Sequence, residues 1–216
     1  MLRHIPLFVA AMLLAACVGS TATVVSPAGG QRIQQVQDAP YNGPQKRIAV
    51  TNFEWRGSAE IGRGMKDMMT DALFNSGRFI VLERDRINEV MDEQDLSNSR
   101  RFKKETAAPI GELEGAELLV RGTITQFEPD CSGGSVIIAS AKKACMTLNI
   151  RILDAKTGRV VNATTVEGTS SNAGVGLVFA GGTLPVGLGA FSKTPMETAI
   201  RQCIEAAVQH IVNTKL

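Results

Sequence analysis

Cys17 is the residue of this sequence whose neighbours point most directly to a chemical reaction. It follows Leu14-Ala15-Ala16, which end an apolar run that starts at Ile5. The run is too short to cross a bilayer as a helix, and with the basic residues before it, it is typical of a signal peptide. Leu-Ala-Ala-Cys resembles the bacterial lipobox, in which the cysteine thiol receives a diacylglycerol. We therefore predict lipidation of Cys17, with an ordinary secretory signal as the alternative.

Three further cysteines suit other roles. Cys131 and Cys145 flank a short segment, and in an oxidising compartment a disulfide between them is expected, with two free thiols as the alternative. Closing a loop of this length would stabilise the fold by about 3 kcal/mol. Cys203 falls on the apolar side of a predicted helix, where a thiol behaves as a small hydrophobic side chain.

Residues suited to catalysis or metal binding are sparse. His210 is the one histidine beyond the signal peptide. No nucleophile elbow, phosphate-binding loop or dinucleotide-binding motif follows a predicted strand, and no His, Cys and Asp residues have metal-ligand spacing. The mixed charges of Glu83-Arg84-Asp85-Arg86 suit ion pairs and helix capping. We expect no enzyme activity, no cofactor and no metal.

A net charge of +2, with one Trp and one Tyr, argues against nucleic-acid binding.

An uncharged, glycine-rich segment spans residues 168–192. Around Gly181-Gly182 it has two arms in which apolar residues alternate with mostly small ones. The apolar positions are Ala173, Val175, Leu177 and Phe179 in the first arm, and Leu184, Val186, Leu188 and Ala190 in the second. This pattern is typical of a membrane β-hairpin, which would need copies from other subunits to pair its edges. The alternative is a loop packed on its own domain, favoured by Pro185 because proline lacks a backbone donor.

The remaining sequence predicts the elements that would position these residues. We assign residues 1–16 to the signal peptide, 17–45 to the lipidated cysteine and a flexible polar tether, and 46–216 to one α/β domain. Apolar and alternating runs predict strands at 47–53, 79–82, 117–127, 146–153 and 159–168, and helical spacing predicts helices at 59–75, 85–96 and from Pro195 onward. This order predicts an α/β fold with a mixed β-sheet sandwiched by helices, which lie mainly on one or both of its faces. The membrane β-hairpin at 168–192 would be an added element.

Several short motifs resemble the CsgG/HfaB family of curli secretion lipoproteins. They are Ile48-Ala-Val-Thr-Asn-Phe53, Gly77-Arg-Phe-Ile-Val-Leu-Glu-Arg84, Glu93-Gln94, Leu118-Leu-Val-Arg-Gly122 and Leu153-Asp-Ala-Lys-Thr-Gly-Arg159. The resemblance covers about residues 46 to 213 and implies a CsgG-like, anticodon-binding-domain-like fold. It further implies an outer-membrane lipoprotein that forms a homo-oligomeric ring, lends two β-hairpins per subunit to a shared barrel, and exports amyloid-like subunits. Val18 in place of Asp after the lipidated cysteine favours, by resemblance to other lipoproteins, a site on the periplasmic face of the outer membrane.

Two departures from the family pattern leave two functions open. The stretch from Glu54 to Glu60 is too short for the family's constriction loop, and the first hairpin, at about 123–150, carries charges around the cysteine pair. The first hypothesis is a transport component for curli-like or holdfast material. The second is a periplasmic accessory or adapter lipoprotein that forms no pore and binds an envelope partner.

Overall fold

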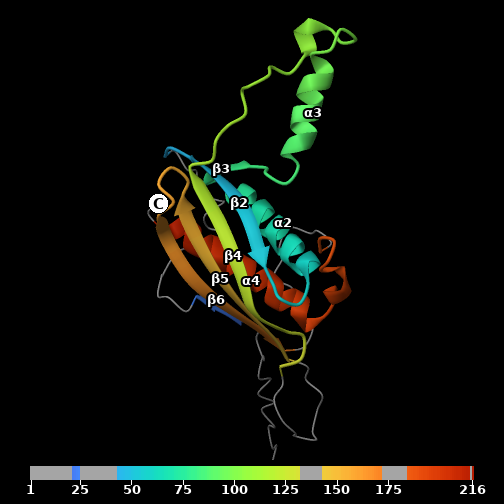
Figure 1. Cartoon of the computed structure of the whole chain (residues 1–216). Coiled ribbons are helices and arrows are strands. Elements are labelled where there is room, and N and C mark those ends of the chain that lie inside the picture. Colours follow the sequence, from blue (N-terminus) through green and yellow to red (C-terminus); the bar gives the residue numbers. More distant parts are fainter. Residues whose placement is uncertain (1–20, 25–42, 132–142, 172–183, 215) are drawn as a thin grey trace, which may run out of the picture.

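A six-stranded mixed β-sheet forms the centre of the molecule (Figure 1). The computed structural model describes residues 21–24, 43–131, 143–171, 184–214 and 216. The strands are β1 (Thr21–Val24), β2 (Lys46–Glu54), β3 (Phe79–Leu82), β4 (Leu118–Glu128), β5 (Lys143–Asp154) and β6 (Val160–Ser171). The helices are α2 (Ala59–Asn75), α3 (Ile87–Ser97) and α4 (Pro195–Asn213), with short 3₁₀ turns η1 (Lys104–Thr106) and η2 (Gly189–Phe191).

The strand order is β1-β6-β5-β4-β2-β3. β2 runs parallel to both β3 and β4, and each of those connections contains a helix, as a parallel pair requires. β4, β5 and β6 follow one another as an antiparallel meander, and β1 adds to β6 antiparallel. The predicted mixed α/β sheet is therefore confirmed.

Helix α2 begins where the sequence predicts, at a side-chain cap. The Ser58 hydroxyl accepts a hydrogen bond from the Glu60 amide at 3.2 Å, which satisfies one of the free N–H groups of the first turn. Met65, Met69 and Leu73 lie one turn apart and are fully buried. The helix ends before Gly77, whose positive φ of 65° glycine adopts without strain.

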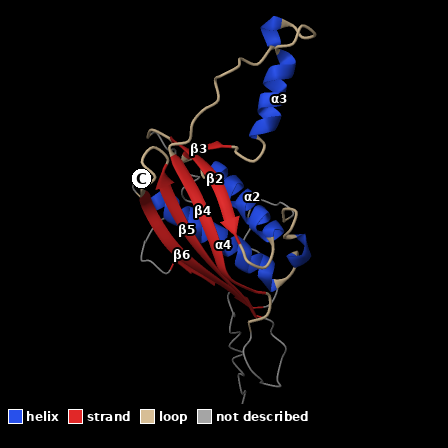
Figure 2. Ribbon diagram, viewed as in Figure 1, coloured by secondary structure: helices blue, strands red, loops and turns tan. Residues whose placement is uncertain are grey.

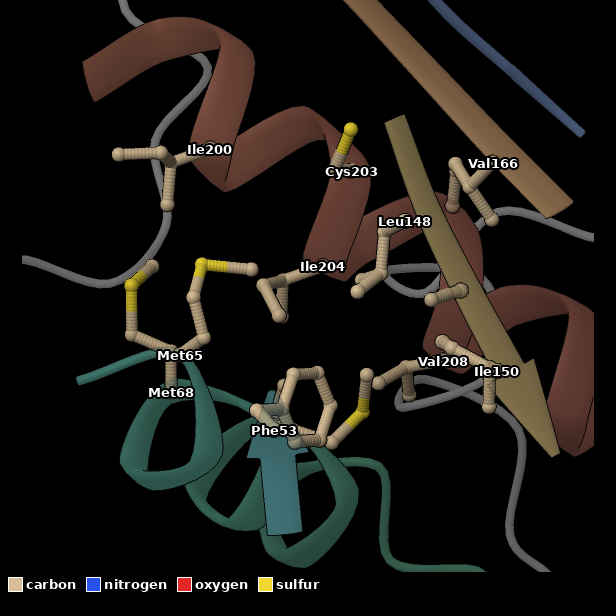
Figure 3. Close-up of a cluster of buried hydrophobic side chains, with 14 of the residues drawn as sticks. Phe53, Met65, Met68, Leu148, Ile150, Val166, Ile200, Cys203, Ile204 and Val208 are labelled. Atoms are coloured by element: carbon tan, nitrogen blue, oxygen red, sulfur yellow. The ribbon is translucent and has the colours of Figure 1, made fainter. Parts of the chain in front are cut away.

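Helix α4 carries the longest apolar stripe of the domain. Ile200, Cys203 and Ile204 face the sheet, where they meet side chains of β5 and β6, while Met65 of α2 closes the same cluster (Figure 3). Thr194-Pro195-Met196-Glu197 has the sequence of a capping box, which forms only in part. Glu197 accepts a hydrogen bond from the Lys193 amide at 2.6 Å, whereas the Thr194 hydroxyl donates back to the preceding 3₁₀ turn instead of capping the helix.

Both α2 and α4 pack on the same face of the sheet (Figure 2). Alternate residues of the meander, such as Leu148 and Ile150, point toward them and are buried. The opposite face carries polar residues, including Arg121 and Arg151, and no helix of the described part lies over it. The helices thus cover one face of the sheet, which is one of the two arrangements that the order of the elements predicts. None of the helices in the described ranges is long and apolar enough to span a bilayer.

Two elements depart further from expectation. Residues 21–24 fall inside the predicted flexible tether, yet they form β1 at the sheet edge. Residues 86–116, which we call the arm, comprise α3, η1 and the return to β4, and they stand away from the two layers (Figure 1). No other element of the described chain packs extensively along α3.

Candidate functional site

Cys131 and Cys145, which the sequence singles out, lie at one end of the sheet, which we call the disulfide end. The register places the end of β4 beside Cys145, the start of β5 beside Ser171, and Thr21 beside Thr169. Ser171 is also the last described residue before the glycine-rich segment continues. Cys17 lies outside the described residues, as do Ala173, Val175, Leu177 and Phe179 of the first predicted hairpin arm.

A disulfide joins Cys131 and Cys145 in the structure, with the two Cα atoms 5.8 Å apart. The backbone supports the same pairing, because the Cys131 amide donates to the Lys143 carbonyl at 2.7 Å. The bond ties the chain leaving β4 to the start of β5. The tip of the family's first hairpin would be built on this pair, and its residues 132–142 lie outside the described ranges.

The second arm of the predicted membrane hairpin is not a strand, so this prediction is wrong for residues 184–190. Leu184 and Leu188 are buried, with 8% and 0% of their surface exposed, whereas Val186 between them is 90% exposed. Alternation would have put all three on one side. Pro185 supplies no ladder donor, and Gly187 turns the chain with a φ of 94°. Ala190 is exposed within η2.

This segment instead packs on its own domain, which was the alternative. Leu188 fits against Gly64 of α2, where a Cβ atom added to the glycine would lie 2.7 Å from the leucine Cγ. Phe191 packs edge-on against Phe127 with ring centroids 5.0 Å apart. Phe127 in turn meets Trp55 at 6.0 Å. The aromatic row joins the segment to the end of β4 and to the connection between β2 and α2.

Beside that row lies a cleft of about 750 Å³ at the carboxyl end of β2, next to the middle of β4. The connection between β2 and α2 is only Trp55–Ser58, which bears out the shortness seen in the sequence. Trp55, Arg56 and Thr123 are among the residues that line it. The carboxyl ends of parallel strands commonly carry binding crevices in α/β folds.

An ion pair between a nearly buried lysine and a half-exposed aspartate lines this cleft. The Lys66 ammonium, whose side chain is 10% exposed, donates to the carboxylate of Asp85. Glu83 accepts hydrogen bonds from the amides of Arg84 and Asp85 at 2.8 and 2.7 Å. The charged run thus forms the predicted ion pair, but the predicted helix cap is absent, because Arg86 at the N-cap of α3 makes no side-chain capping hydrogen bond. Burial, together with the carboxylate of Asp85, raises the pKa of the neighbouring Asp67. The periodicity of α2 gives no sign of the Lys66 partner, because a lysine on the helix face is ordinarily solvated.

The groups of α4 that could do chemistry are placed as core residues. Burial raises the pKa of the Cys203 thiol to about 12, so the thiolate needed for a nucleophile is suppressed. His210 is 8% exposed, and burial lowers its pKa. Its Nε2 lies 3.2 Å from the side-chain oxygen of Asn162 on β6. Within the described ranges, no three His, Cys, Asp or Glu residues are placed to share a metal ion.

The sequence matches the family model described as curli production assembly/transport component CsgG over residues 31–216. No curated protein matches it. Among solved structures, the hypothetical protein CT253 from Chlamydia trachomatis is similar with a TM-score of 0.47 and 14% identity, over 78% of this chain and 96% of that one. The PelC dodecamer from Paraburkholderia phytofirmans gives a TM-score of 0.43 and 10% identity, over 91% of this chain and 100% of that one.

A third structure, protein XCC0632 from Xanthomonas campestris, gives a TM-score of 0.44 and 14% identity, over 78% of this chain and 85% of that one. All three scores lie below 0.5, and similarity at this level does not extend to function.

Proposed function

The chain belongs to the family of the curli production assembly/transport component CsgG, and on that basis we propose that it is a lipid-anchored subunit of a homo-oligomeric assembly that transports secreted surface components. The match from residue 31 to 216 carries this proposal, because it takes in all of the described helices and five of the six strands. Curli-like or holdfast subunits are the proposed cargo, and periplasmic accessory proteins the proposed partners.

The anchor and the site of action follow from the start of the chain. We propose that the signal peptide, residues 1–16, is removed and that Cys17 carries the lipid. The protein then acts at the periplasmic face of the outer membrane. The disulfide between Cys131 and Cys145 agrees with such an oxidising location.

Two observations favour a second candidate, an adapter that forms no pore. The connection Trp55–Ser58 is too short to reach into a channel as a constriction loop. Residues 184–190 pack on their own domain and contribute no strand. An adapter would keep the fold and the anchor, and would use the cleft beside Trp55 or the arm to bind an envelope partner.

The mass of the acylated protein distinguishes the two candidates. The full-length protein would be extracted from outer membranes in mild detergent and measured by light scattering, next to Cys17→Ala, which cannot be lipidated. The transport assembly predicts a particle of several subunits that conducts ions after reconstitution in planar bilayers. A particle of one or two subunits without conductance would rule out the transport assembly and leave the adapter. Release of Cys17→Ala into the soluble fraction tests the anchor independently.

A further inference from the structure

Helix α3 exposes apolar surface that its own domain does not cover. Val90 and Met91 are 43% and 47% exposed, and Leu96 is 51% exposed. Among the residues of α3 only Ser97 is buried. An isolated helix of 11 residues is marginal in water, because most helical stability in proteins comes from packing an amphipathic face. The arm therefore needs a surface to pack against.

The charge of α3 defines what that surface must look like. Glu89, Asp92, Glu93 and Asp95 are its charged residues, and it has no lysine or arginine. Glu93 and Asp95 lie in its second half, where they oppose the negative end of the helix dipole. A partner surface with exposed apolar side chains would cover Val90 and Met91, and cationic side chains beside them would offset the negative charge of α3.

The turn before β6, near the opposite edge of the sheet, offers such a surface. β1 pairs with β6 only from Val166 to Thr169, so the edge of β6 before Val166 has no partner strand within the described residues. At its start, Val160 and Val161 are 55% and 45% exposed. The preceding turn exposes two cations, Lys156 and Arg159. We call Lys156 to Val161 the acceptor turn.

The arm and the acceptor turn lie at the same end of the sheet but on different sides of the molecule. The arm returns to β4 at Leu118, which pairs with Asp154 at the end of β5. The arm leaves from β3 at one edge of the sheet, whereas β6 lies next to the other edge. The arm points away from its own domain (Figure 1), so it does not reach its own acceptor turn. A contact between two different faces of identical subunits is head-to-tail and can close a ring.

We propose that α3 of one copy docks on the acceptor turn of the next copy. Val90 and Met91 would cover Val160 and Val161, and the acidic side chains would meet Lys156 and Arg159. The proposal rests on the homo-oligomeric assembly proposed above and names its interface. Complementary charge fixes the register of such contacts, and the apolar pair supplies burial.

Charge reversal on each side tests this interface. The full-length acylated protein would carry Asp92→Lys with Glu93→Lys on the arm, or Lys156→Glu with Arg159→Glu on the acceptor turn. We expect each pair to weaken assembly in detergent by about tenfold or more, and the four changes together to restore it, since opposite charges face each other again. Asp71→Lys with Glu128→Lys is the matched control, because both residues are exposed elsewhere. Unchanged urea midpoints would show that every variant is folded.

A crosslink locates the contact directly. Copies with Met91→Cys and copies with Val161→Cys would be expressed together, and a disulfide between copies of different type is expected on a non-reducing gel. If the wild type assembles but neither charge reversal nor crosslinking has an effect, this interface is wrong and the proposed function stands. If the wild type itself is monomeric in detergent, both the assembly and its interface are overturned.

Discussion

The substitution Leu188→Ala tests whether Leu188 is part of the protein core or faces lipid. Leu188 is fully buried against Gly64 of α2 and belongs to the main core. Truncating a buried leucine to alanine costs about 2–5 kcal/mol, through lost transfer free energy and the cavity left behind. Val186, two residues away, is 90% exposed. Val186→Ala should therefore change the free energy of unfolding by less than about 0.5 kcal/mol.

Urea unfolding of the chain with Cys17→Ser, which lacks the lipid, measures both effects. Fluorescence of Trp55, the single tryptophan, follows the transition. With a slope of roughly 2 kcal/mol/M, Leu188→Ala should lower the midpoint by roughly 1–2 M, and Val186→Ala should leave it nearly unchanged. Equal effects of the two substitutions, or no effect of either in the absence of lipid, would refute the packing of this segment on the domain.

Three further predictions concern the sheet, the disulfide and the histidine. Gly168→Ala should destabilise the domain by about 1–3 kcal/mol in urea unfolding, because a Cβ there would lie 2.6 Å from a thiol sulfur of α4; Gly115→Ala, with open space around it, is the control. Replacing Cys131 and Cys145 by alanine should cost about 3 kcal/mol by the loop-entropy model, and a reductant should then shift the midpoint of the parent but not of the variant. Since burial lowers the pKa of His210 below its ordinary 6.5, the unfolded chain binds more protons, and stability present above pH 6.5 should fall as the pH drops below it. His210→Gln should flatten that part of the profile; an unchanged pH dependence would contradict the assignment.

The sequence predicts the parts of this fold that are governed by hydrophobic periodicity. It predicts helix α2 at the residues that the helix occupies, because the buried methionines recur every three or four positions. The strands of the meander alternate in the sequence as they do in the structure. The pairing of Cys131 with Cys145 follows from spacing and compartment.

The remaining features depend on contacts that a single segment does not encode. β1 is only four residues long and pairs with β6, so its sequence pattern is too short to predict a strand. In residues 184–190 the alternation is present in the sequence, but Gly187 and Pro185 break the strand and turn two leucines inward. The amphipathic pattern of α3 predicts a helix without revealing that it faces away from its own domain. The partner of Lys66 comes from the loop after β3, a tertiary contact.

Strand β1 also limits the length of the tether that connects Cys17 to the folded domain. Thr21, its first residue, lies four positions after Cys17, and four residues span at most about 14 Å even when fully extended. A free 28-residue coil would reach roughly 30 Å. With lipid on Cys17, as proposed, the disulfide end of every copy would be pinned to the bilayer, so copies would search for one another by lateral diffusion in a plane. Their arms, at the opposite end of the sheet, would then travel at one common height above the lipid.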